Sequence, residues 1–165
     1  MITTARYSGL SCSLYWADFF LIITSFLHAF GYLPVNILAI DTAGTYAGIA
    51  LLQGDTIVAG GTDCARSHAD VCLDLLHDLL AKAALTLNAI DCYAFSEGPG
   101  GYTGLRVGAG IIQGLSLVHP QPVIHIPTPA AYAYAFFKNR MDLDVLRLVM
   151  HAYGDQYYTS IHKRD

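Results

Sequence analysis

The sequence predicts an α/β protein built on a mixed sheet. From residue 36 onward, three short strands follow one another across tight turns, and strands and helices then alternate. The composition agrees with a folded domain, because the 165 residues are 54% hydrophobic and 13% charged, with a mean hydropathy of +0.42. A disordered chain requires low hydrophobicity and high charge. The net charge of −4 excludes a general basic field for nucleic acid.

Residues 1–35 are an apolar extension that differs from the rest of the chain. They carry only two charges, Arg6 and Asp18. Their dense apolar part, residues 19–30, is shorter than the roughly 20 residues of a membrane-spanning helix. A signal peptide would need a more basic start and a small-residue cleavage site. Because Val35 can be decoded from a GTG start codon, we predict that translation begins there and that residues 1–34 are not native. A signal-like anchor and an unusual native extension are the alternatives.

The first three elements after this extension are predicted strands. Residues 37–42 are an apolar run that ends in a polar pair, as a buried strand does. Residues 46–52 and 56–60 give two more strands after turns at residues 43–45 and 54–55. Connections this short predict an antiparallel meander.

Helices and strands alternate after the meander. Ser67 and Asp70 have the spacing of a helix capping pattern, and an apolar stripe continues from there to about Leu85. The predicted elements that follow are a strand at 92–96, a helix at about 103–117, a strand at 123–126 and a helix at about 129–137, which Thr128 caps. This order suits a mixed sheet of the ribonuclease-H-like or actin-like kind.

We therefore expect residues 36–140 to form a first actin-like subdomain. Residues 141–165 begin a second one with two predicted strands, 146–151 and 156–162. An isolated hairpin is only marginally stable. The sequence thus predicts a second subdomain that is incomplete.

The segment GPGGYTGLRVG, residues 98–108, joins a predicted strand to a predicted helix. A helix N-terminus can bind an anion, but this loop lacks the Gly-Lys-Ser/Thr of a P-loop, and its third glycine is one position late for G-x-G-x-x-G. Gly104 and Gly108 lie four residues apart, as do Gly110 and Gly114. Each helical glycine costs about 1 kcal/mol relative to alanine. Four of them predict that the sheet beneath, or a helix of another chain, approaches the backbone closely, and we favour a helix-to-helix interface.

The DTAGT turn at residues 41–45 resembles the first phosphate turn of actin-like ATPases. The candidate nucleotide-binding residues are Asp41, Thr42, Gly44, Thr45 and Gly100. The other interpretation of Asp41 is a carboxylate that accepts hydrogen bonds from turn amides. We predict no metal site, because His68 and His77 lie nine residues apart and point to opposite sides of one helix.

Three segments carry a family resemblance: ILAIDTAGTYAGIAL at the first hairpin, Ser67-His68 at the first long helix, and GPGGYTGLRVG followed by IIQGLSL. Together they resemble the TsaB (YeaZ) family, which takes part in bacterial tRNA threonylcarbamoyladenosine modification. The resemblance covers residue 36 to the end of the chain. It implies an actin-like ATPase fold and a non-catalytic scaffold, which forms homodimers or pairs with the catalytic paralogue TsaD and is joined by the ATPase TsaE.

The resemblance implies that the complex transfers a threonylcarbamoyl group to an adenosine of tRNA. The four cysteines, Cys12, Cys64, Cys72 and Cys92, show no C-x-x-C spacing and are expected to be reduced thiols, which fits a cytoplasmic protein. No membrane contact is expected if residues 1–34 are not native. No intrinsic cofactor is expected, since ATP and metal belong to the partner enzymes, and tRNA is reached through the complex. The alternative function is a small actin-like ATPase or kinase-like enzyme.

The resemblance also implies a partner surface on the first two long helices. Its candidate residues in this sequence are Ser67, His68, Val71, Leu75, Thr103, Gly104, Val107, Gly108 and Ile111.

Overall fold

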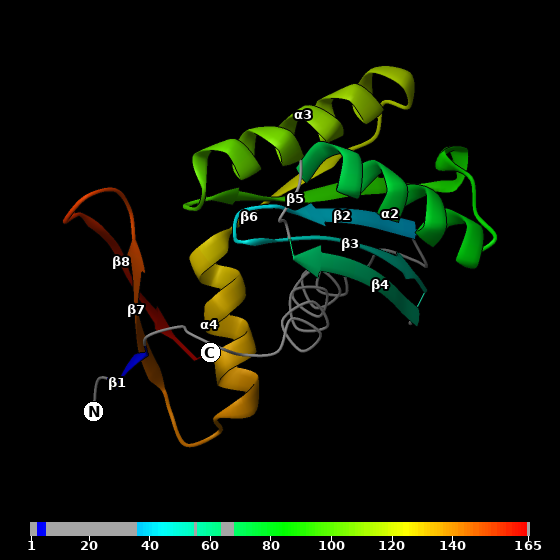
Figure 1. Ribbon diagram of the computed structural model, residues 1–165. Helices are drawn as coiled ribbons and strands as arrows, with labels where there is room; N and C mark the ends of the chain where they lie inside the picture. Colours follow the sequence, from blue (N-terminus) through cyan, green and yellow to red (C-terminus); the bar gives the residue numbers. More distant parts are fainter. Residues whose placement is uncertain (1–2, 6–35, 55, 64–67, 165) are drawn as a thin grey trace.

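A computed structural model describes residues 3–5, 36–54, 56–63 and 68–164 (Figure 1). It contains a five-stranded sheet of order β4-β3-β2-β5-β6 and a three-stranded sheet of order β1-β7-β8. The strands are β1 (Thr3–Ala5), β2 (Asn36–Asp41), β3 (Tyr46–Gln53), β4 (Thr56–Asp63), β5 (Cys92–Gly98), β6 (Val123–Pro127), β7 (Val145–His151) and β8 (Tyr157–Lys163). The helices are α2 (His68–Lys82), the short 3₁₀ helix η1 (Leu87–Ala89), α3 (Tyr102–Val118) and α4 (Thr128–Asn139).

The larger sheet is mixed, as the sequence predicted. Strands β2, β3 and β4 form the antiparallel meander, while β2 pairs parallel with β5 and β5 pairs parallel with β6. The central strand β2 has Ala39 opposite Ala50 on one side and Ala94 on the other. From Ile37 to Asp41 it is buried throughout, because both faces of the sheet are covered.

Helices cover the larger sheet on both sides. Helices α2 and α3 lie along one face, and α4 lies on the other face, between the two sheets (Figure 1). The strand residues divide accordingly, because alternate side chains point to opposite faces. Leu38 and Ile40 pack in the core under α2 and α3, whereas Ile37 and Ala39 belong to the core that includes Ala131 of α4.

Helix α2 ends at Lys82, three residues before the predicted end near Leu85. The amide of Leu85 donates to the carbonyl of Leu80 (3.0 Å), and the amide of Ala84 donates to that of Ala81 (3.2 Å). This pair of bonds is a Schellman motif, which requires a left-handed residue after the helix. Ala84 takes that conformation with φ of 52°, although glycine is the usual residue there. The chain thus ends the helix without the glycine that would have marked its end in the sequence.

The start of α4 also differs from the prediction. Thr128 is the first residue of the helix rather than its cap, and Pro127 occupies the N-cap position. The Thr128 side chain is 2% exposed, and its hydroxyl makes no hydrogen bond in the structure. The physical reason is the Pro-Thr-Pro junction, because proline is well suited to the first turn of a helix, where no amide partner is needed.

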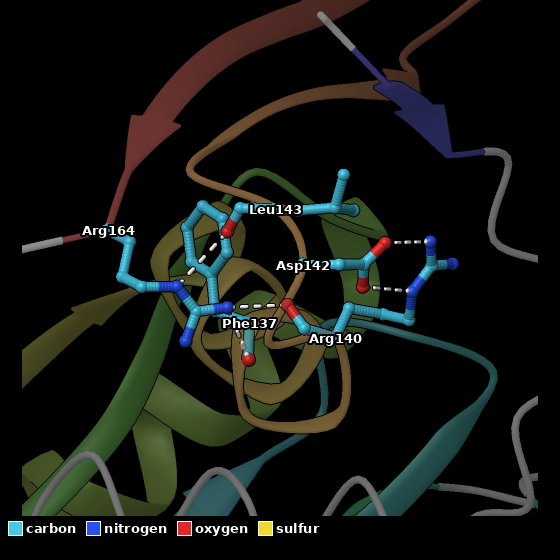
Figure 2. Close-up of polar contacts among 5 residues, drawn as sticks. All are labelled: Phe137, Arg140, Asp142, Leu143 and Arg164. Carbon is cyan, nitrogen blue, oxygen red and sulfur yellow. Dashed lines mark hydrogen bonds and ion pairs between the residues drawn. The ribbon is translucent and has the colours of Figure 1, made fainter.

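Arg164, which follows β8, links the hairpin of β7 and β8 to the C-terminus of α4 (Figure 2). Its guanidinium lies over the ring of Phe137, 5.2 Å from the centroid. It donates to the carbonyls of Phe137 (2.8 Å), Arg140 and Leu143 (3.0 Å). The last carbonyls of a helix have no partner within the helix. One side chain therefore satisfies the end of α4 and ties the smaller sheet to it.

Beside it, Arg140 holds Asp142 through two hydrogen bonds of 2.9 Å (Figure 2). The hydrogen bond from Arg140 is the largest cause that lowers the pKa of Asp142 to about 2.

Strand β1 was not predicted. Thr3–Ala5 pair parallel with β7, with Thr3 opposite Leu146. These residues belong to the predicted apolar extension, and the rest of that extension lies outside the described residues. Within the part of the chain that the structure describes, no helix has the length and apolarity needed to cross a membrane.

Candidate functional site

A cleft of about 1000 Å³ lies between the two sheets. Its walls come from the turn after β2, the glycine loop before α3, the first turn of α4 and the end of β7. Gly44 and Gly100, both predicted to bind nucleotide, line it together with Gly101. Thr128 and His151 line it as well, although no sequence motif places either residue at this site. The fold therefore brings two segments 56 residues apart in sequence (Gly44 and Gly100) to one cleft.

The glycine loop packs closely against the turn after β2. A side chain at Gly100 would place its Cβ 2.5 Å from the carbonyl oxygen of Ala43. The amide of Gly101 donates to that same oxygen at 2.7 Å. Only a residue without a side chain fits this approach. The loop is thus built for close backbone packing at the cleft wall.

Two other candidate nucleotide-binding residues are engaged inside the protein. One carboxylate oxygen of Asp41 accepts a hydrogen bond from the amide of Ala43 (2.8 Å) and another from the hydroxyl of Ser96 (2.5 Å). The hydroxyl of Thr42 donates to the carbonyl of Gly104 at 2.7 Å. Both side chains are at least 95% buried, and neither lines the cleft. Asp41 thus organises the turn, which is the other interpretation considered for it. Thr45 is exposed on the same turn, outside the cleft lining.

The glycines of α3 divide into two pairs with different surroundings. Gly104 and Gly108 are buried, and a Cβ at Gly108 would lie 2.6 Å from the Thr42 hydroxyl. Gly110 and Gly114 are exposed, and a Cβ at either would meet no atom within 4 Å. The structure therefore places the first pair against its own sheet rather than on the outer surface where a partner was predicted. The second pair leaves the helix backbone open.

The candidate residues on α2 lie on more than one side of the helix. Ser67 and the side chain of His68 lie outside the described residues. Val71 and Leu75 are half-buried in the core, and Leu75 lies 3.3 Å from where a Cβ at Gly60 of β4 would be. That flank of α2 therefore packs over the outer strand of the sheet. At 100° per residue, Leu73 falls on the opposite flank, toward α3, and it is 53% exposed.

The outward side of α3 supplies the rest of this surface. Thr103 is exposed, while Val107 and Ile111 are half-buried on the flank that also carries Gly110 and Gly114. We call the combination of Leu73 on α2 with Thr103, Val107, Gly110 and Gly114 on α3 the α2–α3 surface. Of its α3 residues, Thr103 and Val107 are among the candidates that the resemblance implies, and Gly110 and Gly114 belong to the glycine spacing from which the sequence predicts a close approach. Leu73 is not among the predicted residues. The sequence signal that could have identified it is an apolar residue that lies off the apolar stripe of α2.

Among the residues that the structure describes, no group of three or more histidines, cysteines, aspartates or glutamates is placed to hold a metal ion.

The mixed sheet, with helices on both faces and a second sheet across a cleft, defines an α/β protein of the actin-like class. The family model for tRNA N6-adenosine threonylcarbamoyltransferase (TsaD) matches residues 60–159. The tRNA threonylcarbamoyladenosine biosynthesis protein TsaB of Escherichia coli is 33% identical over 131 residues, which are 79% of this chain and 56% of that protein. Its counterpart in Haemophilus influenzae is 33% identical over 127 residues, covering 77% and 54%.

The solved structure of YeaZ from Pseudomonas aeruginosa superposes with a TM-score of 0.73 at 27% identity, over 79% of this chain and 60% of that one. The chain belongs to the TsaD family, in its TsaB (YeaZ) branch. The resemblance predicted from the sequence motifs is thereby confirmed. The chain spans about half the length of the TsaB relatives it matches.

Proposed function

We propose that this chain is a scaffold subunit in the threonylcarbamoyladenosine modification of tRNA. It pairs with a catalytic TsaD-type paralogue and activates it, and a TsaE-type ATPase completes the complex. The observation that carries the proposal is the 33% identity to proteins named for tRNA threonylcarbamoyladenosine biosynthesis. In this proposal ATP and metal belong to the partner enzymes, and tRNA is bound through the complex. The net charge of −4 supports that indirect route, because tRNA binding depends on basic side chains.

The α2–α3 surface is the proposed contact with the TsaD-type paralogue. Leu73 offers an exposed apolar side chain, which is the kind of group that anchors an interface once it is desolvated. On α3, Gly110 and Gly114 leave the helix backbone open to close approach. A homodimer through the same surface is the competing assembly.

The test is light-scattering mass of the full chain, alone and mixed with a TsaD-type partner. We expect a one-to-one complex with the wild type. Gly110→Leu should leave the fold intact, because no atom lies within 4 Å of its Cβ position, and should weaken the complex at least tenfold. Asn88→Leu, which adds the same side chain at an exposed residue of η1, is the matched control and should bind as the wild type does. A folded wild-type chain that forms no complex would overturn the proposal.

A second candidate function is nucleotide binding in the cleft. It is favoured by the gathering of Gly44, Gly100, Gly101 and the first turn of α4 at one site, where backbone amides and a helix N-terminus suit a phosphate. Calorimetric titration of the chain with ATP and Mg²⁺ tests it. Binding that Gly44→Val abolishes would support a nucleotide role. The absence of measurable heat would contradict nucleotide binding by this chain and would assign the nucleotide to the partner enzymes.

A further inference from the structure

Strand β8 is an open edge of the smaller sheet (Figure 1). Among the residues that the structure describes, only β7 pairs with it. Natural edge strands are often short or interrupted by proline, because unpaired backbone groups attract other strands. Strand β6, an edge of the larger sheet, follows that rule, since it has five residues and ends at Pro127. Strand β8 does not, because its seven residues include neither proline nor glycine.

The unpaired backbone groups of β8 belong to alternate residues. The carbonyl of Gln156 accepts a hydrogen bond from the amide of Ala152 (2.9 Å), and the amide of Arg164 donates to the carbonyl of Asp144 (2.9 Å). In an antiparallel pair, residues bonded to the partner strand alternate with residues whose backbone groups point away from it. The even-numbered residues of β8 therefore bond to β7. The odd-numbered residues direct their amides and carbonyls to the open edge: Tyr157, Thr159, Ile161 and Lys163.

The side chains of these odd-numbered residues are exposed as well. Tyr157 is 59% exposed and Ile161 is 61% exposed, although both are residue types that favour packing within a sheet. They lie on the face of the smaller sheet away from α4, because the β8 residues opposite Leu146 and Leu148 share the face that packs on α4. Strand β8 thus offers both a free hydrogen-bonding edge and exposed strand-forming side chains, which together suit the addition of another strand.

The sequence of β8 complements itself when two copies run antiparallel. If Thr159 of one copy lies opposite Thr159 of the other, Tyr157 lies opposite Ile161 in both halves of the pair. Threonine opposite threonine and an aromatic residue opposite a β-branched one are favourable cross-strand pairs. The same register brings Asp155, in the turn before β8, to Lys163 at the end of the other strand, and the two-fold symmetry repeats this charge pair. Other registers move these opposite charges apart.

We propose that the open edge of β8 binds the same edge of a second copy of this chain and joins the two smaller sheets into one continuous sheet. The charge complementarity identifies the occupant, because β8 supplies both members of each charge pair. Each hydrogen-bonded pair of residues adds two backbone bonds to the ladder. The assembly closes at two copies, since the pairing occupies both β8 edges. The inference concerns a different surface from the α2–α3 surface and does not depend on the proposed function.

The test is the mass of the full chain by sedimentation velocity over a wide range of concentrations. We expect a monomer–dimer equilibrium for the wild type. Thr159→Pro should weaken the dimer at least tenfold, because proline removes an amide that points to the open edge and leaves the amides that bond to β7 in place. Thr159→Val keeps the amide and the β-branched side chain, so this matched control should dimerise within threefold of the wild type.

The charge pairs give a second test that does not involve proline. Lys163→Glu places like charges at both ends of the paired strands and should weaken the dimer three- to tenfold. Adding Asp155→Lys exchanges the two charges and should restore the affinity to within threefold of the wild type. A wild-type chain that stays monomeric at every concentration would overturn the proposal, and so would a dimer that is insensitive to both Thr159→Pro and Lys163→Glu. Failure of the charge exchange to restore a weakened dimer would overturn the antiparallel register.

Discussion

At the residue scale, the four glycines of α3 have the same helix-breaking chemistry but different surroundings. Gly108 allows the helix to lie against the end of β2, where the Thr42 hydroxyl occupies the space of a side chain. Gly110, two residues later, faces open space. Sequence spacing could detect that two sides of the helix carried glycine. It could not tell which side met the protein's own sheet, because that depends on how α3 packs against β2.

We expect alanine substitutions at Gly108 and Gly110 to change the free energy of unfolding in opposite directions. Gly108→Ala should lower the free energy of unfolding by about 1–3 kcal/mol, because its Cβ would lie 2.6 Å from the Thr42 hydroxyl. Gly110→Ala should raise it by up to about 1 kcal/mol, because alanine is the better helix former and nothing obstructs it. Urea denaturation of both variants is the measurement. Equal effects would contradict the assignment of the two helix sides.

Ala84 is a second position where one backbone angle decides the outcome. Its left-handed conformation, with φ of 52°, costs an L-residue about 1–2 kcal/mol, part of which glycine recovers. Ala84→Gly should therefore stabilise the protein by about 0.5–1 kcal/mol, as measured by chemical denaturation. The control is Ala81→Gly, inside α2, where glycine should cost about 1 kcal/mol. A loss of stability in both variants would contradict the Schellman ending of α2.

At the scale of elements, the sequence predicted the strands and helices from residue 36 onward to within a few residues. Apolar runs and short turns specify β2, β3 and β4 locally, so those could be found without tertiary information. The element boundaries that the sequence predicted wrongly depend on backbone conformation and on distant pairing. Helix α2 ends through a left-handed alanine, and α4 begins at a proline cap. Strand β1 depends on pairing with β7, more than 140 residues away, which no local pattern reveals.

Arg164 contributes to the attachment of the smaller sheet, together with the apolar cluster of Phe137, Leu146 and Leu148. We expect Arg164→Met to lower the free energy of unfolding by about 1–3 kcal/mol, because methionine retains contact with Phe137 but removes the donors to the carbonyls at the end of α4. Amides of β7 and β8 should exchange with solvent faster in this variant, whereas those of β2 and β5 should not. Lys163→Met, at the exposed neighbouring residue, is the control. Uniformly faster exchange in both sheets would show that Arg164 does not act on the hairpin alone.

At the scale of the whole molecule, the cleft is formed partly by local sequence motifs and partly by residues that are distant in the sequence. The glycine loop and the DTAGT turn were visible as motifs, and both reach the cleft. The opposite wall, with Thr128 and His151, comes from elements that meet only after α4 and β7 have packed. The role of Asp41 also required the fold, because its partner Ser96 lies 55 residues later on β5. The motifs thus reach the cleft, and tertiary packing decides which of their residues line it.

The buried centre of the larger sheet also sets how the molecule responds to alkaline pH. Cys92 and Tyr93 lie on β5, where burial raises the pKa of both groups, and for Cys92 burial and the nearby charge of Asp91 raise it from 9.0 to about 11. Below pH 9 the thiol is neutral in the folded and unfolded chains, so its contribution to stability is fully present. Between pH 9 and 11 the unfolded chain ionises first, and that contribution is lost.

We therefore expect the free energy of unfolding to fall by about 2 kcal/mol more in the wild type than in Cys92→Ala across the interval from pH 9 to 11. Tyr93 is present in both proteins, so the difference between the two curves isolates Cys92. Urea denaturation under reducing conditions at each pH gives both curves. If they run parallel, the Cys92 thiol ionises as readily in the folded chain as in the unfolded one, which would contradict its burial on β5.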